Sequence, residues 1–358
     1  MTKQMTSKER VLTTFAHQEP DHTPCWLGAS PEWIELARAY LGLADDEALL
    51  RYIGDDFRRV FAAYAGPPER SPNLLLSSPE ATWRSPFNIE RHGYGYGMPL
   101  NCPLKTATLA DVHAYPWPDP DWMDVSKIKA TAAQWGGEFA ILGGEWSPFW
   151  HDAIDLLDFD ALIYQMFDNP DIVHAVMKYT ADYYLEVSRR IFEASGDAID
   201  IFFIGNDLGA QTGPLLSPAL FRRFVLPQLK RFVDLGHEYG KLVVLHTDGA
   251  MRLIIPDLIK IGMDGMQSVQ PFATGMELGG LKRDFGKDFT FFGCVDTQAL
   301  IETTPEGAKQ LTLDVLNTMK PGGGFVASPS HDYLLPETPV ENVIIMYETI
   351  KEYGGYKK

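Results

Sequence analysis

Short apolar runs alternate with longer amphipathic stretches through the second half of the chain. One run, in "EFAILGGEW", ends at Glu145, and others end at Asp207 and at His246. Between them, as in "SPALFRRFVLPQLKRFVDLGHEYG", apolar residues recur every three or four positions, which is typical of helices that bury one face. Alternating strands and helices form a parallel sheet with right-handed crossovers. The pattern predicts strands that start near Phe139, Ile199, Leu242, Gly265, Thr290 and Gly324.

Two further apolar segments, near Thr23 and Asp56, bring the expected number of strands to eight. Eight strand–helix units in a chain of 358 residues predict an α/β protein with the TIM (β/α)8 barrel fold. A doubly wound sheet is the alternative. We interpret residues 1–358 as one barrel domain.

The first residues predict a helix ahead of the barrel. Thr6 and Ser7 are both suitable N-caps, and Val11, Leu12 and Phe15 fall on one helical face.

Residues 66–105 break the regular pattern, because they are dense in Pro, Gly, Ser and aromatic residues. Loops this long are either functional or disordered, and aromatic residues are scarce in disordered chains. We therefore predict a long loop excursion with short strands, lying over a site.

Composition narrows the classes of function. The net charge of −17 argues against a nucleic-acid or anionic-membrane partner, since both require a basic surface. The three cysteines are too few for a disulfide framework. No stretch approaches the roughly 18 to 20 apolar residues of a membrane span, and the polar N-terminus has no apolar signal core. These features predict a soluble, cytoplasmic protein.

Polar residues follow every strand of the second half. In a barrel, the carboxyl ends of the strands meet at one mouth, which is where such enzymes have their active sites. We therefore predict that these groups converge on one site. They are Glu145, Asn206, Asp207, His246, Asp248, Gln267, Gln270, Cys294, Asp296, Ser328, Ser330 and His331.

Three of these residues suggest a metal site. His246 and Asp248 are two positions apart, so both side chains can face the same side of an extended chain. His331 comes from a different strand end. Two imidazoles and a carboxylate leave open coordination positions, as at a catalytic zinc or another divalent metal. Cys294 is either a fourth ligand or a small buried residue of "FFGCV".

Two other carboxylates are candidates for catalysis. Asp207 either moves a proton or binds a polar substrate, or with Asn206 it caps the following turn. Glu145 lies beside Trp146 and Trp150, so it is either a carboxyl group with a raised pKa in an aromatic wall or a surface N-cap.

The whole chain resembles the uroporphyrinogen decarboxylase superfamily. The stretches that carry the resemblance are "ERVLTTFAHQEPDHTPCW", "AYPWPDPD", "SPALFRRFVLPQLKRFVD", "FGCVDTQALIETTPEGAK" and "SPSHDYLLPETPVENVIIMYE". The resemblance implies a TIM barrel. It also implies one of two chemistries, decarboxylation or methyl transfer.

The decarboxylase branch carries an arginine-rich segment after its first strand, which binds an acidic porphyrinogen. The matching segment here, "CWLGASPEW", has no arginine. The cobalamin-dependent methyltransferases bind zinc through His-x-Cys after one strand and Ser-Pro-Gly-Cys after the last. This chain has His246-Thr247-Asp248 and Ser328-Pro329-Ser330-His331 at those places, so the resemblance implies a harder donor set suited to an oxygen substrate.

We therefore predict a metal-dependent methyltransferase of the O-demethylase type. It would move a methyl group from a small methoxylated, aromatic substrate to cobalamin carried by a partner corrinoid protein, with a homodimer as a possible assembly. The alternatives are a decarboxylase-like lyase and a non-catalytic barrel that binds a tetrapyrrole or corrinoid. The residues predicted to contact the substrate are Trp26, Trp146, Asn206, Gln211, Gln270 and Tyr333.

Overall fold

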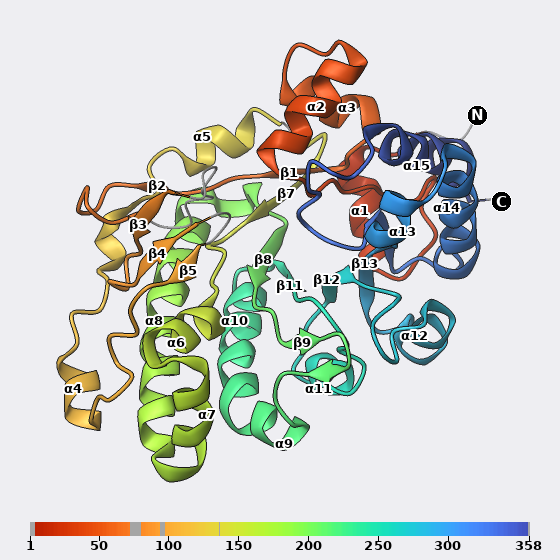
Figure 1. Cartoon of the computed structure of the whole chain (residues 1–358). Helices are drawn as coiled ribbons and strands as arrows, with labels where there is room; N and C mark the ends of the chain where they lie inside the picture. Colours follow the sequence, from red (N-terminus) through yellow and green to blue (C-terminus); the bar gives the residue numbers. More distant parts are fainter. Residues whose placement is uncertain (1–3, 72–79, 94–96, 136, 357–358) are drawn as a thin grey trace.

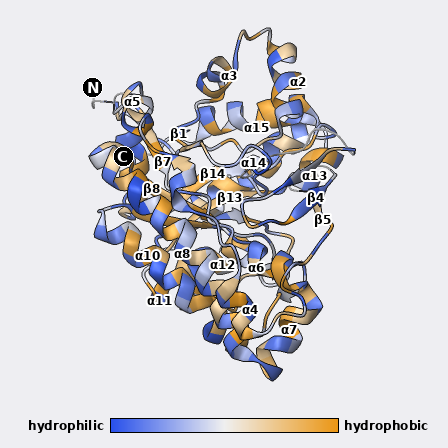
Figure 2. Cartoon of the chain, turned by 90° about the vertical axis from the view of Figure 1, so that its left-hand side faces the viewer, coloured by the Kyte–Doolittle hydropathy of each residue, from blue (hydrophilic) through white to orange (hydrophobic). Residues whose placement is uncertain are grey.

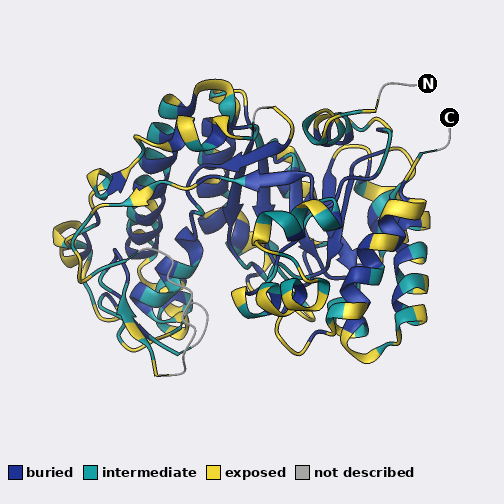
Figure 3. Ribbon diagram, turned by 90° about the horizontal axis from the view of Figure 1, so that it is seen from above, coloured by how far each residue is buried: buried dark blue, intermediate teal, exposed yellow. Residues whose placement is uncertain are grey.

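Seven parallel strands form the curved central sheet in the computed structural model, which describes residues 4–71, 80–93, 97–135 and 137–356. Viewed from above, buried strands lie at the centre, and the surrounding helices expose their outer faces (Figure 3). In spatial order the strands are β1 (Phe57–Arg59), β7 (Ala140–Gly143), β8 (Ile201–Gly205), β11 (Leu242–His246), β12 (Gly265–Val269), β13 (Thr290–Val295) and β14 (Phe325–Pro329).

The predicted strand near Thr23 is reduced to isolated bridges at Cys25, which pairs in parallel with both Asp55 and Ala327. Cys25 therefore lies between β1 and β14 and completes the ring of strands. The TIM-barrel prediction is confirmed, and the first of its eight strands is shorter than predicted. The physical reason is Pro24, whose nitrogen has no hydrogen to donate to a ladder.

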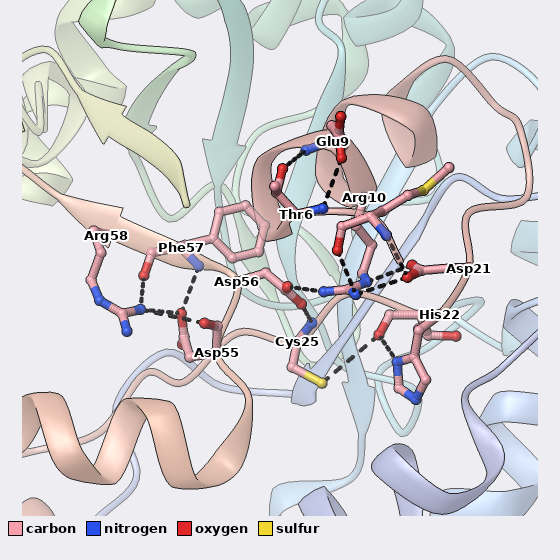
Figure 4. Close-up of polar contacts among 12 residues, drawn as sticks. Thr6, Glu9, Arg10, Asp21, His22, Cys25, Asp55, Asp56, Phe57 and Arg58 are labelled. Carbon is pink, nitrogen blue, oxygen red and sulfur yellow. Dashed lines mark hydrogen bonds and ion pairs between the residues drawn. The ribbon is translucent and has the colours of Figure 1, made fainter. Parts of the chain in front are cut away.

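Carboxylates supply part of the missing ladder. Asp56 Oδ2 accepts the backbone N–H of Cys25 at 2.8 Å (Figure 4). Asp55 Oδ2 accepts the backbone N–H of Leu27 at 2.7 Å. Asp56 Oδ1 also accepts from Arg10 Nη1 at 2.6 Å. Side-chain oxygens thus add to the few backbone bonds that join the closing segment to its neighbours.

Helix α1 (Ser7–Phe15) lies against the amino ends of the strands. Thr6 caps it in a capping box with Glu9, as the sequence predicts for its first turn. Lys8 pairs with Asp200, which precedes β8, at 2.7 Å. Val11 and Phe15 belong to the barrel's inner cluster with Phe57, Ala140, Leu142, Ile201, Phe203, Val244, Phe292 and Val326.

The other helices surround the sheet (Figure 1), and bands of hydrophilic and hydrophobic residues alternate along them (Figure 2). No helix in the described ranges is long and apolar enough to cross a bilayer. The α-helices are α2 (Pro31–Leu41), α3 (Asp46–Ile53), α4 (Leu109–Ala114), α5 (Ile128–Ala133), α6 (Phe149–Leu157), α7 (Phe159–Asp168), α8 (Pro170–Ser195), α9 (Pro218–Leu220), α10 (Leu226–Glu238), α11 (Ile255–Lys260), α12 (Leu278–Phe285), α13 (Thr297–Glu302), α14 (Pro305–Met319) and α15 (Val340–Tyr353). Short 3-10 turns cover Pro120–Trp122 and Gly196–Ala198, and a π-helical turn covers Phe221–Val225.

The excursion at 66–105 contains a small antiparallel sheet, although residues 72–79 and 94–96 lie outside the described part of the chain. Arg91 on this sheet pairs with Asp155 on α6 at 2.5 Å, and Phe87 packs on Tyr183 and Tyr184 of α8. The excursion is therefore anchored to the helices that follow β7. Its strands are β3 (Thr82–Arg84), β4 (Glu90–His92) and β5 (Met98–Pro99), and β2 (Ala63–Tyr64) pairs separately with β6 (Met123–Asp124).

Candidate functional site

Three of the strand-end residues converge at the carboxyl end of the barrel. His246 is the last residue of β11, Asp248 follows two positions later, and Asp207 follows β8. One nitrogen or oxygen atom from each lies within 4.8 Å of the others. His246 Nε2 is 3.3 Å from Asp207 Oδ1. Asp207, predicted as a catalytic residue, thus lies directly against the predicted metal ligands.

Two glycines allow this convergence. Residues after Asp207 form a hairpin of β9 (Gly209–Ala210) and β10 (Gly213–Pro214), which lies against the loop after β11. A Cβ on Gly209 would be 2.5 Å from Asp248 O. One on Gly249, whose φ is 85°, would be 2.5 Å from the Gly209 carbonyl carbon. Only glycine fits at these positions, so the backbones touch and the two carboxylates stay close.

A buried network orients His246. Its Nδ1 is 2.5 Å from Gln267 Oε1, and the Gln267 amide donates to Asp332 Oδ1 at 3.1 Å. The Trp146 ring packs on the imidazole, with centroids 5.2 Å apart. Burial disfavours the imidazolium, but the hydrogen bond and charge of Asp207 prevail and raise the pKa of His246 to about 10. The network leaves Nε2 directed at Asp207.

Two more histidines contact the carboxylates. His331 Nε2 is 3.2 Å from Asp248 Oδ2, and His151 Nε2 is 3.4 Å from Asp207 Oδ2. Burial alone would raise the pKa of both carboxyl groups, but the neighbouring imidazoles lower it below its ordinary value. The pattern of strand ends does not point to His151, because His151 lies on α6, six positions beyond the strand-end Glu145.

Glu145 is buried and precedes Trp146, whose ring packs on His246. Burial raises the pKa of its carboxyl group to about 7, against the lowering effects of the Arg59 charge and the backbone N–H of Trp146. Arg59 lies over the rings of Trp146 and Phe203. Of the two alternatives for Glu145, the structure therefore favours a buried carboxyl group over a surface N-cap.

The residues predicted to contact the substrate lie in different parts of the structure. Trp26 and Trp146 pack against the inner cluster of the barrel. Gln270 is buried and donates to Asp248 Oδ1 at 3.3 Å, and Gln211 donates to Gln270 Oε1 at 3.4 Å. Tyr333 lies beside His331 and donates its backbone N–H to Nδ1 of that ring.

Asn206 differs from the expectation of a substrate contact, whereas Cys294 agrees with the second of its two alternatives, a small buried residue. Asn206 is fully buried, accepts the N–H of Trp150 at 2.9 Å and donates to Ser147 O at 3.1 Å. Its amide thus holds the turn before α6, and the residue exposes no surface to a substrate. Cys294 packs in the core cluster that includes Phe289, Phe291 and Leu281, and burial raises the pKa of its thiol. The group of donor atoms at the mouth does not include Cys294.

The donor set at the mouth fits a divalent cation. An imidazole nitrogen and two carboxylate oxygens are ligands that zinc, iron and manganese accept, and three protein ligands leave a position open for substrate. The charge of Asp207 acts to raise the pKa of Asp248, and a cation between the two carboxylates would relieve this repulsion. His246, Asp207 and Asp248 are the residues that would hold it.

Fold and site together define a TIM-barrel enzyme with its polar groups at the carboxyl ends of the strands. The family model for uroporphyrinogen decarboxylase matches residues 101–353, so the chain belongs to this family. Uroporphyrinogen decarboxylase of Azoarcus sp. strain BH72 is 23% identical over 97% of this chain and 96% of its own length.

Methyltransferases are also among the similar proteins. The methylcobamide:CoM methyltransferase MtbA of Methanosarcina acetivorans is 24% identical over 63% of this chain and 62% of its own length. The solved structure of a methyltransferase from Methanosarcina mazei aligns with a TM-score of 0.67 at 20% identity, covering 98% of this chain and 99% of that one. At this identity, the structural likeness establishes the fold.

Proposed function

We propose that this protein is a corrinoid-dependent methyltransferase that demethylates a small methoxylated aromatic compound. The observation that carries the proposal is the convergence of His246, Asp207 and Asp248 at the barrel mouth, in a chain that resembles a methylcobamide:CoM methyltransferase. Nitrogen and oxygen donors suit a harder cation than thiolates do, and such a cation favours an oxygen substrate over a thiol.

In the proposed reaction, the C–O bond of the methoxyl group breaks as the methyl carbon passes to the reduced corrinoid of a partner protein. The electron pair stays on the substrate oxygen, which takes up a proton. A divalent metal bound at the mouth would supply Lewis-acid polarisation of that oxygen.

The chain's own residues bind the substrate and hold the proton. Burial raises the pKa of Glu145 to about 7, so this carboxyl group can hold a proton near neutral pH and is suited to give it to the oxygen. Its neighbour Trp146 packs on His246, and Trp26 donates to Asp332 Oδ1 at 3.1 Å. These two indoles form an apolar wall against which an aromatic ring can lie.

The test is an anaerobic assay with a reduced corrinoid protein and a panel of methoxylated aromatic compounds. We expect the absorbance of the reduced corrinoid to decay as the demethylated phenol appears in equal amount. The Asp248→Asn variant is the control, since it keeps the side-chain shape and loses the charge. Metal-loaded protein that transfers no methyl group from any methoxylated compound would contradict the proposal.

A decarboxylase-like lyase is the second candidate, and the pairing of His246 with Asp207 favours it. Without a metal, the raised pKa of His246 keeps an imidazolium beside a carboxylate at neutral pH, and this pair could bind and protonate a small carboxylated substrate. Metal-depleted protein would then release CO₂ from carboxylated aromatic compounds. Loss of all activity on chelation would exclude this candidate.

A further inference from the structure

His246 and His331 are the two histidines predicted as metal ligands, and they differ in the hydrogen bond at Nδ1. The partner of this nitrogen is an acceptor in His246 and a donor in His331. A neutral imidazole carries one N–H and one lone pair, and the partner of each nitrogen decides which nitrogen has the proton. A metal binds the nitrogen that has the lone pair. The partners of Nδ1 therefore show whether Nε2 is available as a ligand.

For His246 the partner of Nδ1 is an acceptor. Gln267 Oε1 lies 2.5 Å away. The orientation of this amide is fixed at its other end, where Gln267 Nε2 donates to the Asp332 carboxylate at 3.1 Å. When the ring is neutral, its proton therefore resides on Nδ1, and Nε2, which lies 3.3 Å from Asp207 Oδ1, has the lone pair.

For His331 the partner of Nδ1 is a donor. The backbone N–H of Tyr333 donates to this nitrogen at 3.0 Å, and a backbone N–H can act in no other way. The ring proton is therefore on Nε2, which lies 3.2 Å from Asp248 Oδ2. A nitrogen that bears a proton offers no lone pair to a metal, whereas it can donate a hydrogen bond to the carboxylate.

We infer that His246 is the only metal ligand of the two histidines and that His331 is a positioning residue that holds Asp248 through its Nε2–H. The inference rests on the metal site of the proposed function. It replaces the expectation of two histidine ligands with one nitrogen and two oxygens, from His246, Asp207 and Asp248. On the same grounds Gln267 is a positioning residue for His246.

Zinc titration of the full metal-free chain against a chromophoric chelator tests this assignment. Glutamine is the informative replacement, because its amide nitrogen lies near the place of Nε2 and can donate a hydrogen bond. We expect one zinc per wild-type chain, none for His246→Gln, and one for His331→Gln with affinity within about tenfold of wild type.

Two further variants distinguish the loss of an orienting hydrogen bond from a loss of folded structure. His331→Ala removes the donor to Asp248 and Gln267→Leu removes the acceptor from His246, so each should keep one zinc but bind it about 10 to 100 times more weakly. Restoration of affinity by His331→Gln relative to His331→Ala is the signature of a hydrogen-bond donor. Thermal unfolding of each metal-free variant checks that it is folded.

If wild type binds one zinc while both His331→Gln and His331→Ala bind none, His331 is a ligand and the inference is wrong, although the proposed metal site stands. If folded wild type binds no divalent metal, both the inference and the metal part of the proposed function are wrong.

Discussion

Two groups of buried or half-buried carboxylates lie at opposite ends of the barrel, and they differ in what their oxygens contact. Before β1, Asp55 and Asp56 accept backbone N–H groups, and Arg10 pairs with Asp56 (Figure 4). At the mouth, Asp207 and Asp248 face imidazoles. The pKa of Asp55 is raised to about 7, chiefly by burial, whereas imidazole contacts lower that of Asp207.

The difference separates a structural role from a chemical one. Backbone N–H groups and guanidinium groups keep their protons throughout the ordinary pH range, so the Asp55 and Asp56 oxygens are permanently occupied. An imidazole can release its proton and offer a lone pair to a metal. The number of acidic residues therefore does not identify the site, whereas the chemistry of their partners does.

The largest expected effect tests the structural group. Asp56→Ala removes the acceptor of the buried backbone N–H of Cys25 and one of the two carboxylates that bind Arg10, whose other partner is Asp21. Together these losses should lower the free energy of unfolding by about 3 to 5 kcal/mol. Chemical denaturation measures this change. Asp46→Ala, which breaks an exposed ion pair with Arg38, is the control and should cost less than about 1 kcal/mol. A similar small loss for both variants would contradict the structural role of Asp56.

The second largest effect is expected for the carboxylates at the barrel mouth. Asp207→Asn removes one charged oxygen donor beside His246, and methyl transfer should fall about 100-fold, which corresponds to about 2.7 kcal/mol. The matched control is Asp264→Asn, because Asp264 pairs with His237 at 2.9 Å outside the mouth. We expect the control to keep wild-type transfer and zinc binding. Equal losses in both variants would show that Asp207 has no special role.

The sequence pattern predicts most of the barrel because its central strands are long apolar runs. It fails for the segment at Cys25, where the ladder is reduced to a few backbone bonds beside Pro24 and carboxylates add further bonds. It finds His246 and Asp248 because the first ends a strand and the second follows it by two positions. It misses His151, whose contact with Asp207 depends on where α6 packs, and the hydrogen-bond direction at His331, which depends on a backbone N–H.

The pH dependence of Glu145 gives a smaller effect. If its protonated form donates to the substrate oxygen, the rate should fall up to about tenfold per unit as pH rises above its pKa of about 7. Because burial raises this pKa above the ordinary value, its contribution to stability is present at low pH and is lost as pH rises through 7. Glu145→Gln should remove both pH dependences. An unchanged pH–rate profile in this variant would assign the proton to another group.

The smallest effect is expected for helix α1, at the amino ends of the strands. Thr6→Ala removes the side-chain acceptor of the α1 capping box, and the loss should lower the free energy of unfolding by about 1 kcal/mol. Helix α1 contacts the amino ends of the strands, far along the barrel from the mouth, so zinc affinity and methyl transfer should stay at wild-type values. Thr6→Ser keeps the hydroxyl and should restore stability. A fall in zinc affinity for Thr6→Ala would mean that the two ends are coupled, and the separation between structural and chemical carboxylates would then be incomplete.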